Sequence, residues 1–439
     1  MTAAFAGISR WHFDANRATI PRGLSVHVQL RLEAAIKAEL VRAKRNVLTL
    51  AGAQAFAAAG PPIIVSLGGI IGQTLAPYRA LATLPVSLYT IGIAAGTIPV
   101  ALLLRRFGRR PVYLAGCLLG MVAGLLAAYG VASALFLPFC LGSFLAGLNG
   151  ACVQSYRFAA IDAAPMGGKA RALSSVMIGG LVASVIGPQT VIWTRNAIPG
   201  IPFSASFLAQ SVLALLAFCV LLRLDVPPIH NEHTAAPRPV TQILRTPGFA
   251  LAVVTGLISY SVMSFVMTAA PIAMVGCGHT IGQAALGIQW HVLAMYGPSF
   301  FTGRLIDRFG QRRVTIWGMG LLAAGAVTAL TGTGLVNFWG TLILLGLGWN
   351  FGFLGASSMV AACARPEERA HIQGLNDFLI FGATAMASLF SGGLVQASGW
   401  NAIAWIMLTV AAGAMALLAL YGWRDRRARP AALMLDPLA

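Results

Sequence analysis

Long apolar segments alternate with short polar loops along most of the chain. Each holds about 20 mostly apolar residues, the length that a helix needs to cross the hydrocarbon core of a membrane. Twelve such segments are found, at residues 46–71, 80–104, 111–131, 133–155, 172–194, 203–222, 248–272, 284–303, 314–334, 336–359, 374–396 and 400–423. The pattern predicts an all-α membrane protein with twelve transmembrane helices.

Two features near the N-terminus modify this pattern. Pro61 and Pro62 interrupt the first apolar segment, and proline at mid-membrane breaks the backbone hydrogen-bond ladder, which is tolerated where the freed groups face protein or a cavity. We therefore expect a kinked first helix that lines a cavity. Residues 28–45 have helical periodicity and many basic side chains, which predicts a helix on the inner membrane surface.

The basic residues lie almost entirely on one side of the predicted membrane. The chain has 30 Lys and Arg against 12 Asp and Glu, a net charge of +18, and only Arg79 and Arg195 fall in loops on the opposite side. Loops rich in Lys and Arg are cytoplasmic in multi-pass proteins. This distribution predicts a bacterial inner-membrane protein with both termini in the cytoplasm, and it explains the surplus as topology and lipid contact rather than nucleic-acid binding.

The two halves of the chain repeat one another. Gly108 recurs 202 residues later as Gly310, and Asn149 recurs 201 residues later as Asn350. Nearly constant offsets at corresponding places indicate two pseudo-symmetric six-helix bundles of one design. We predict a basic cytoplasmic tail, an N-terminal six-helix half, a cytoplasmic linker, a C-terminal six-helix half and a second basic tail, at residues 1–45, 46–222, 223–247, 248–423 and 424–439.

The loop after the eighth segment carries a recognisable motif. Residues 303–313 read Gly-x-x-x-Asp-Arg-x-Gly-x-Arg-Arg. With the two six-helix halves, this loop resembles the signature of the major facilitator superfamily. The resemblance implies the major facilitator fold and transport by alternating access. In the family this loop gates the inner mouth, so the resemblance implies gating roles for Gly303, Asp307, Arg308, Gly310, Arg312 and Arg313. The copy of this loop in the first half has Arg105 at the acidic position. The resemblance therefore does not imply the same gating role, which we call the latch, for the first-half loop.

Soft side chains stand at helical spacing in the seventh and eighth segments. Met263 and Met267 are four residues apart, as are His291 and Met295, and residues four apart share a helix face. An ionisable residue inside a membrane span is a functional candidate because its charge is costly to bury. Copper(I) prefers thioether, thiol and imidazole ligands. These four residues are therefore candidate copper ligands, although Met pairs are also common core filling.

Three further soft residues lie in the connection between these segments. Cys277 is a candidate ligand near the outer face, with Met274 and His279 as less certain ones. The chain has six cysteines and no Cys-x-x-Cys pair, so no zinc or dithiol site is indicated. We expect no cofactor, with copper as the transported substrate.

The paired Met-x-x-x-Met and His-x-x-x-Met motifs also resemble those of the CcoA-like bacterial copper importers, which supply copper for cytochrome c oxidase assembly. The resemblance implies copper import. Related carriers in the same branch resemble riboflavin importers. The alternative is therefore an organic-solute carrier, for riboflavin uptake or drug efflux. Aromatic and amide side chains would line its cavity, and our candidates are Asn149, Asn350, Trp290 and Tyr296.

No enzyme is indicated, because the chain lacks a phosphate-binding Gly-rich loop with lysine, a nucleophile elbow and paired carboxylates. The expected partners are the lipid bilayer and either a copper ion or a small-molecule substrate. We expect a monomer.

Overall fold

A computed structural model describes residues 26–164, 168–225, 248–363 and 369–433. Throughout this part of the chain the regular structure is helical. The first group of helices is α2 (Val26–Ala57), α3 (Gly60–Leu75), the short 3₁₀ helix η2 (Arg79–Leu81), α4 (Leu84–Phe107), α5 (Arg109–Ala132), α6 (Phe136–Gln154), α7 (Tyr156–Ala163), α8 (Lys169–Thr194) and α9 (Ser204–Leu221). The second group is α11 (Phe249–Gly276), α12 (Ile281–Tyr296), α13 (Ser299–Phe309), α14 (Gln311–Leu330), α15 (Leu335–Cys363) and α16 (Arg369–Leu433).

Within the described residues, ten helical stretches are long and apolar enough to cross a membrane. Two features account for the difference from the twelve predicted spans. The last stretch continues through Gly399, whose φ of 74° and ψ of −175° divide α16 into two helices. The predicted eighth span is split between α12 and α13 at Gly297 and Pro298, so neither piece reaches the length of a span.

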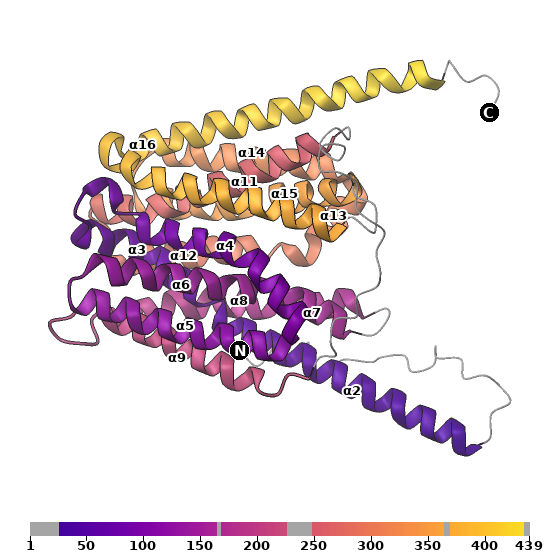
Figure 1. The fold of residues 1–439 in the computed structure, drawn as a ribbon. Coiled ribbons are helices and arrows are strands. Elements are labelled where there is room, and N and C mark those ends of the chain that lie inside the picture. The colour runs from indigo at the N-terminus through magenta and orange to yellow at the C-terminus, as the bar shows by residue number, and fades with distance from the viewer. Residues whose placement is uncertain (1–25, 165–167, 226–247, 364–368, 434–439) are drawn as a thin grey trace.

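The first span is broken near Pro61 and Pro62, as predicted, and the helix predicted at residues 28–45 joins the first part of this span without a break. α2 ends at Ala57, and α3 begins at Gly60 with a proline in its first turn, where proline fits because its missing N–H has no helical partner. The helix predicted at 28–45 is the first part of α2. It continues directly into the first span and projects from the end of the bundle, as α16 does (Figure 1).

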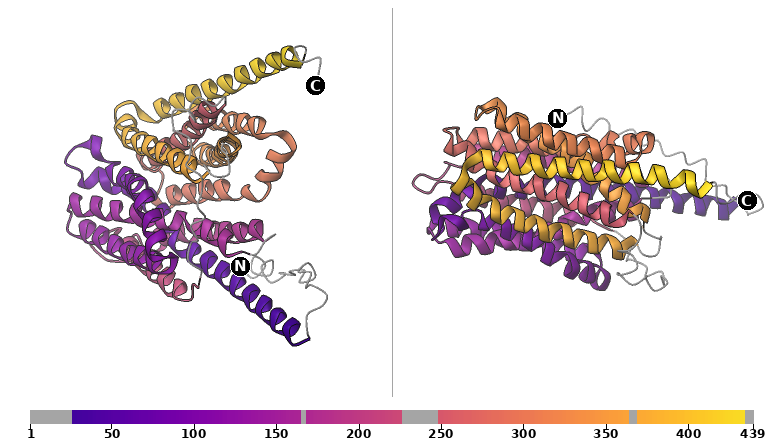
Figure 2. Two further views of the ribbon diagram at one scale, coloured as in Figure 1. Left: turned by 45° about the vertical axis from the view of Figure 1, so that its right-hand side comes forward. Right: turned by 90° about the horizontal axis from the view of Figure 1, so that it is seen from above.

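The helices form two groups that meet along a limited set of contacts. In the first group α6 packs on α4 and α5, and α2 packs on α8; in the second, α15 packs on α14 and α12, and α11 packs on α16. Contacts between groups join α4 with α16, α8 with α12, and α3 with α11 and α12. Figure 2 shows the two groups as separate layers.

The faces that point away from the contacts are apolar. Leu137 is 68% exposed, Phe390 63% and Leu420 61%. Large apolar side chains at this exposure are unfavourable in water and suited to lipid. The outer surface therefore fits the predicted membrane environment.

Among the described residues, side-chain hydrogen bonds between the two groups lie toward one end of the bundle, which we call the η2 end. Thr83 Oγ1 donates to Leu389 O at 3.2 Å and Ser87 Oγ to Ser388 Oγ at 3.2 Å. Gln189 Nε2 donates to Gln289 Oε1 at 3.0 Å. The opposite end, which carries residues 303–313, is called the latch end. In this conformation the η2 end is closed by direct contact between the groups.

Candidate functional site

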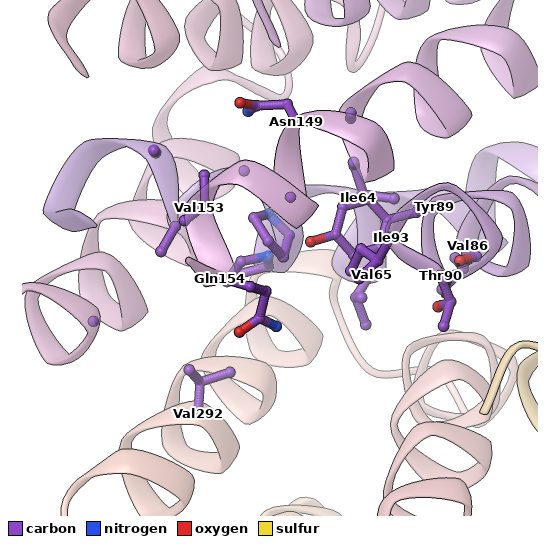
Figure 3. A pocket seen from close by; sticks show the side chains of 18 of the residues that line it. Ile64, Val65, Val86, Tyr89, Thr90, Ile93, Asn149, Val153, Gln154 and Val292 are labelled. Carbon is purple, nitrogen blue, oxygen red and sulfur yellow. Dashed lines mark hydrogen bonds between the residues drawn. The ribbon is translucent and has the colours of Figure 1, made fainter. Parts of the chain in front are cut away.

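A cavity lies between the two groups of helices. Ile64, Tyr89 and Gln154 line it from the first group, and Val292 lines it from the second (Figure 3). Its volume, counted as space open to the centre of a water molecule, is about 160 Å³. Since one water molecule needs about 10–15 Å³ of such space, the cavity has room for a solute much larger than a bare metal ion.

Neutral amides supply the most distinctive polar groups of this central cavity. Gln54, Asn149 and Gln210 line it, and the side-chain oxygen of each is buried without a hydrogen-bond partner among the described residues. A buried acceptor without a partner is costly, so these oxygens are suited to N–H or O–H donors of a bound solute. The described lining residues carry no charged side chain.

An aromatic cluster borders the cavity. Tyr260 makes edge contacts with Trp349 at 5.4 Å, Phe353 at 5.2 Å and Phe381 at 5.5 Å between ring centroids. Trp349 and Phe353 are stacked, with an angle of 19° between their planes and centroids 5.1 Å apart. Flat apolar faces with polar edges are suited to a planar ring system.

A second cavity adjoins the first on this aromatic side. It shares Gln54, Gln154, Tyr260 and Phe381 with the central cavity. Its lining includes Trp349 and Phe353 and two charged residues, Arg157 from α7 and Asp377 from α16. The two cavities therefore form a continuous region whose charged groups lie only in the second.

The predicted metal ligands are only partly brought together. Met263, Met267 and Met295 line the central cavity, but His291 is absent from its lining. His291 is fully buried, and its Nδ1 lies 2.8 Å from Leu342 O on α15. Because a carbonyl only accepts, Nδ1 donates this hydrogen bond. Nε2 has no partner among the described residues.

The three soft residues of the α11–α12 connection lie in different surroundings. Met274 is fully buried in the core of the second group, whereas Cys277 is exposed. His279 Nε2 lies 2.9 Å from Thr333 O, and its ring packs on Phe338 at 5.6 Å. The described part of the chain contains no group of three His, Cys, Asp or Glu suited to a metal ion.

Two of the four predicted cavity residues line the cavity. Asn149 and Tyr296 do so, whereas Trp290 is 42% exposed and lies outside both linings. Asn350 is buried and binds α12 and α13 instead. Its Nδ2 donates to Met295 O at 2.6 Å and Ser299 Oγ at 2.8 Å, and its Oδ1 accepts from Thr302 Oγ1. The repeat of Asn149 as Asn350 thus joins two residues with different surroundings.

Sequence analysis did not identify the glutamines or the charged pair of the second cavity. Gln54 and Gln154 are polar residues in apolar helices, which is the signal that would have found them. Arg157 stands on α7, outside the predicted spans, and Asp377 stands near the beginning of the eleventh. Only the packing of the two groups brings these side chains to one cavity.

The latch loop has matching conformations in both halves. Gly108 has a φ of 82° and Gly310 a φ of 86°, a region that favours glycine. Among the remaining predicted gating residues, Gly303, Asp307 and Arg308 are exposed, and Arg312 lies against Gly422. In the first half the buried Arg109 forms an ion pair with Asp162 and donates to Ala159 O at 3.2 Å.

Comparison with known proteins agrees with this architecture. The family model of the Major Facilitator Superfamily matches residues 47–298 and 256–436. The chain is 54% identical over 373 residues to the riboflavin transporter RfnT of Brucella anthropi, covering 84% of this chain and 94% of that protein. It is 30% identical over 384 residues to the uncharacterized MFS-type transporter YdeG of Bacillus subtilis, covering 83% of this chain and 88% of that protein.

A solved structure gives the same picture of the fold. The nucleoside transporter NupG, as its D323A mutant, superposes with a TM-score of 0.68 at 13% identity, covering 86% of this chain and 99% of that one. At 13% identity this likeness shows the fold alone. The similarity to RfnT supports a small-molecule carrier and does not support the predicted likeness to copper importers.

Proposed function

Because this chain belongs to the major facilitator superfamily and is therefore a membrane transporter rather than an enzyme, we propose that it imports riboflavin or a closely similar planar solute. Transport would proceed by alternating access, with the two groups of helices rocking about the central cavity. Riboflavin has a planar ring system with a hydrogen-bonding edge and a polyhydroxyl chain. The substrate is suggested by the similarity to RfnT, a riboflavin transporter by name.

The observation that carries the proposal is the pairing of unsatisfied amides with aromatic rings in one cavity. Asn149, Gln54 and Gln210 offer buried acceptors, and Tyr260 and Tyr296 offer ring faces with polar edges. The donors of a flavin would satisfy these oxygens, and its rings would stack or pack edge-on against the tyrosines.

We place the latch end in the cytoplasm of a bacterial inner membrane. Arg79 and Arg195, the two basic residues of the predicted outer loops, fall at η2 and just after α8, and the positive-inside rule puts their end outside. The direct contacts at the η2 end then describe an inward-facing conformation. Asp307 and Arg308 would act as the latch when the inner end closes.

Riboflavin uptake by a bacterial auxotroph that lacks its own riboflavin carrier tests this proposal. Cells that express the chain are expected to grow at low riboflavin and to take up labelled riboflavin with saturable kinetics. An excess of unlabelled riboflavin should compete, and an unrelated planar drug should not. Uptake no faster than in cells with an empty vector would contradict the proposal.

Asn149→Leu is expected to raise the KM for riboflavin about tenfold, because a lost hydrogen bond to a buried solute costs about 1–3 kcal/mol. Leucine is similar in volume, so the protein should reach the membrane in normal amounts. The measurement is initial uptake rate against concentration.

The control for this variant is Asn401→Leu, the same change at an exposed position of α16 outside the cavities. It should leave the KM unchanged. An unchanged KM in Asn149→Leu would remove Asn149 from the binding site.

Copper import is a second candidate, for one reason. Met263, Met267 and Met295 line the same cavity, and three thioethers are a soft ligand set. The fourth predicted ligand, His291, lies outside that lining and binds the α15 backbone. The relatives named above give copper no support, so we rank it below riboflavin.

The double variant Met263→Leu/Met267→Leu separates the two candidates. Leucine keeps the volume and apolar character of methionine but cannot bind copper. Riboflavin uptake is expected to stay close to the wild-type rate. If the chain instead carries copper, radioactive copper accumulation should be present in the wild type and lost in this variant, and riboflavin uptake should be absent from both.

A further inference from the structure

The polar groups of the two adjoining cavities differ in kind. The central cavity has three neutral amide oxygens without a hydrogen-bond partner among the described residues, on Gln54, Asn149 and Gln210. The second cavity is lined by Arg157 and Asp377, which are the charged side chains among the described residues of either lining. A solute long enough to occupy both cavities therefore meets neutral acceptors at one end and two opposite charges at the other.

Aromatic side chains lie where the two cavities join. Tyr260, Tyr296 and Phe381 line both cavities, and Trp349 and Phe353 line the second one. The stacked pair of Trp349 and Phe353 and the edge contacts of Tyr260 hold these rings together. Aromatic faces thus continue from the junction into the second cavity, which suits a planar ring system placed there.

The two charged side chains are available to a solute in this conformation. Neither Arg157 nor Asp377 belongs to the ion pairs that the described residues form at 4.0 Å or less. Arg157 Nε is buried without a hydrogen-bond partner among the described residues, and Asp377 Oδ1 accepts a long hydrogen bond of 3.4 Å from Asn376 Nδ2. A guanidinium only donates and an ionised carboxylate only accepts, so the second cavity offers donors and an acceptor side by side.

The two ends of riboflavin present matching groups. The pyrimidinedione edge of its ring system has a single N–H donor, N3, between two carbonyl acceptors, whereas its chain carries several hydroxyl donors. The carbonyls suit the Arg157 guanidinium, N3–H suits the Asp377 carboxylate, and the hydroxyls suit the unpartnered amide oxygens of the central cavity. The reverse placement would set the carbonyls against amide oxygens that also only accept, which is unfavourable.

We propose that Arg157 and Asp377 bind the pyrimidinedione edge of the flavin, and that they thereby place the ring in the second cavity and the hydroxylated chain in the central one. Arg157 donates to a ring carbonyl, and Asp377 accepts from N3–H. The inference rests on the proposed function. It adds the orientation of the solute, and it assigns selectivity for the ring edge to two residues, because hydrogen bonds to charged groups are about twice as strong as neutral ones.

Binding of flavin analogues to the purified protein in detergent tests this orientation. Flavin fluorescence, which aromatic neighbours quench, reports binding at equilibrium without a membrane or a gradient. 3-Methylriboflavin lacks the N3–H donor, and lumiflavin has a methyl group in place of the hydroxylated chain. The wild type should bind 3-methylriboflavin about 30-fold and lumiflavin about tenfold more weakly than riboflavin, because each analogue leaves buried polar groups unpaired.

Three variants assign the two ends of the solute. Asp377→Ala removes the acceptor and makes room for the methyl group, so riboflavin should bind about 30-fold more weakly and about as well as 3-methylriboflavin. Asn149→Leu should weaken riboflavin but not lumiflavin, and it should keep the preference for riboflavin over 3-methylriboflavin. Arg157→Gln should weaken all three flavins, and Arg157→Lys should recover part of the loss. Asp225→Ala, the matched change at an exposed position outside the cavities, should bind all three as the wild type does.

Other outcomes overturn the proposal. Equal affinity of the wild type for riboflavin and 3-methylriboflavin would contradict recognition of the ring edge and leave the substrate in place. An unchanged preference in Asp377→Ala would assign that edge to other residues. If Asp377→Ala gives no monodisperse protein, the nearly isosteric Asp377→Asn decides: its neutral acceptor should reduce the preference to about fivefold, and an unchanged preference would contradict the role of the charge. Absence of riboflavin binding by the wild type would contradict the substrate itself.

Discussion

Oxidation of the double variant Ser87→Cys/Ser388→Cys is expected to stop transport, and reduction to restore it. The two hydroxyl oxygens are 3.2 Å apart, on α4 and α16, and form part of the closed η2 end. Disulfides need side chains whose β-carbons lie about 3.5–4.5 Å apart, and the existing hydrogen bond already brings the two side chains together. A covalent link here would hold the η2 end closed, so the central cavity could never open to that side.

The measurement is riboflavin uptake before and after mild oxidation, with bond formation checked by mass spectrometry. Each single variant is a control, because the chain already has free cysteines, among them exposed Cys219 and Cys277. Single variants should keep their activity under oxidation. Wild-type rates in fully cross-linked protein would show that the η2 end does not need to open.

Gly147→Val is expected to reduce the amount of folded protein strongly. A β-carbon built at Gly147 would lie 2.0 Å from Tyr89 O and 2.9 Å from the Gly92 α-carbon. Both neighbours are backbone atoms of α4, which cannot rotate away as a side chain does. Relief would require separating α4 from α6, and overpacking of this kind costs about 1–3 kcal/mol or more in proteins whose total stability is about 5–15 kcal/mol.

The size-exclusion profile of a fluorescent fusion in detergent measures this effect, and the monodisperse peak should largely disappear. Gly320→Val is the matched control, because a β-carbon at Gly320 meets no atom within 4 Å. It should give a normal peak. A normal peak for Gly147→Val would mean that the two helices cross less closely than described.

The apolar pattern predicted the fold because lipid imposes a strict length on each helix. Pro61 and Pro62 likewise marked the break between α2 and α3, since a missing N–H acts locally. Gly108 and Gly310, which helped to reveal the repeat, both adopt a positive φ, 202 residues apart. These features depend on the backbone, and proline and glycine each determine the backbone conformation at their own position.

The substrate site was harder to predict because it depends on the direction of individual side chains. His291 and Met295 are one turn apart on α12, yet Met295 lines the cavity and the His291 imidazole binds Leu342 O. A spacing of four places two residues on one face, but the neighbouring helix decides what each side chain contacts. Arg157 and Asp377 are 220 residues apart in the sequence, and no local pattern links them.

The break between α12 and α13 has a mechanical consequence. Asn350 of α15 bonds to residues on both sides of it, Met295 before and Ser299 and Thr302 after. α13 buries little beyond Thr302. Asn350 therefore lies where a hinge between α12 and α13 would be, and α13, which carries Asp307, can move about this point while α12 stays packed on α15. We therefore expect a movement of the segment that carries Asp307 to leave the packing of α12 on α15 in place.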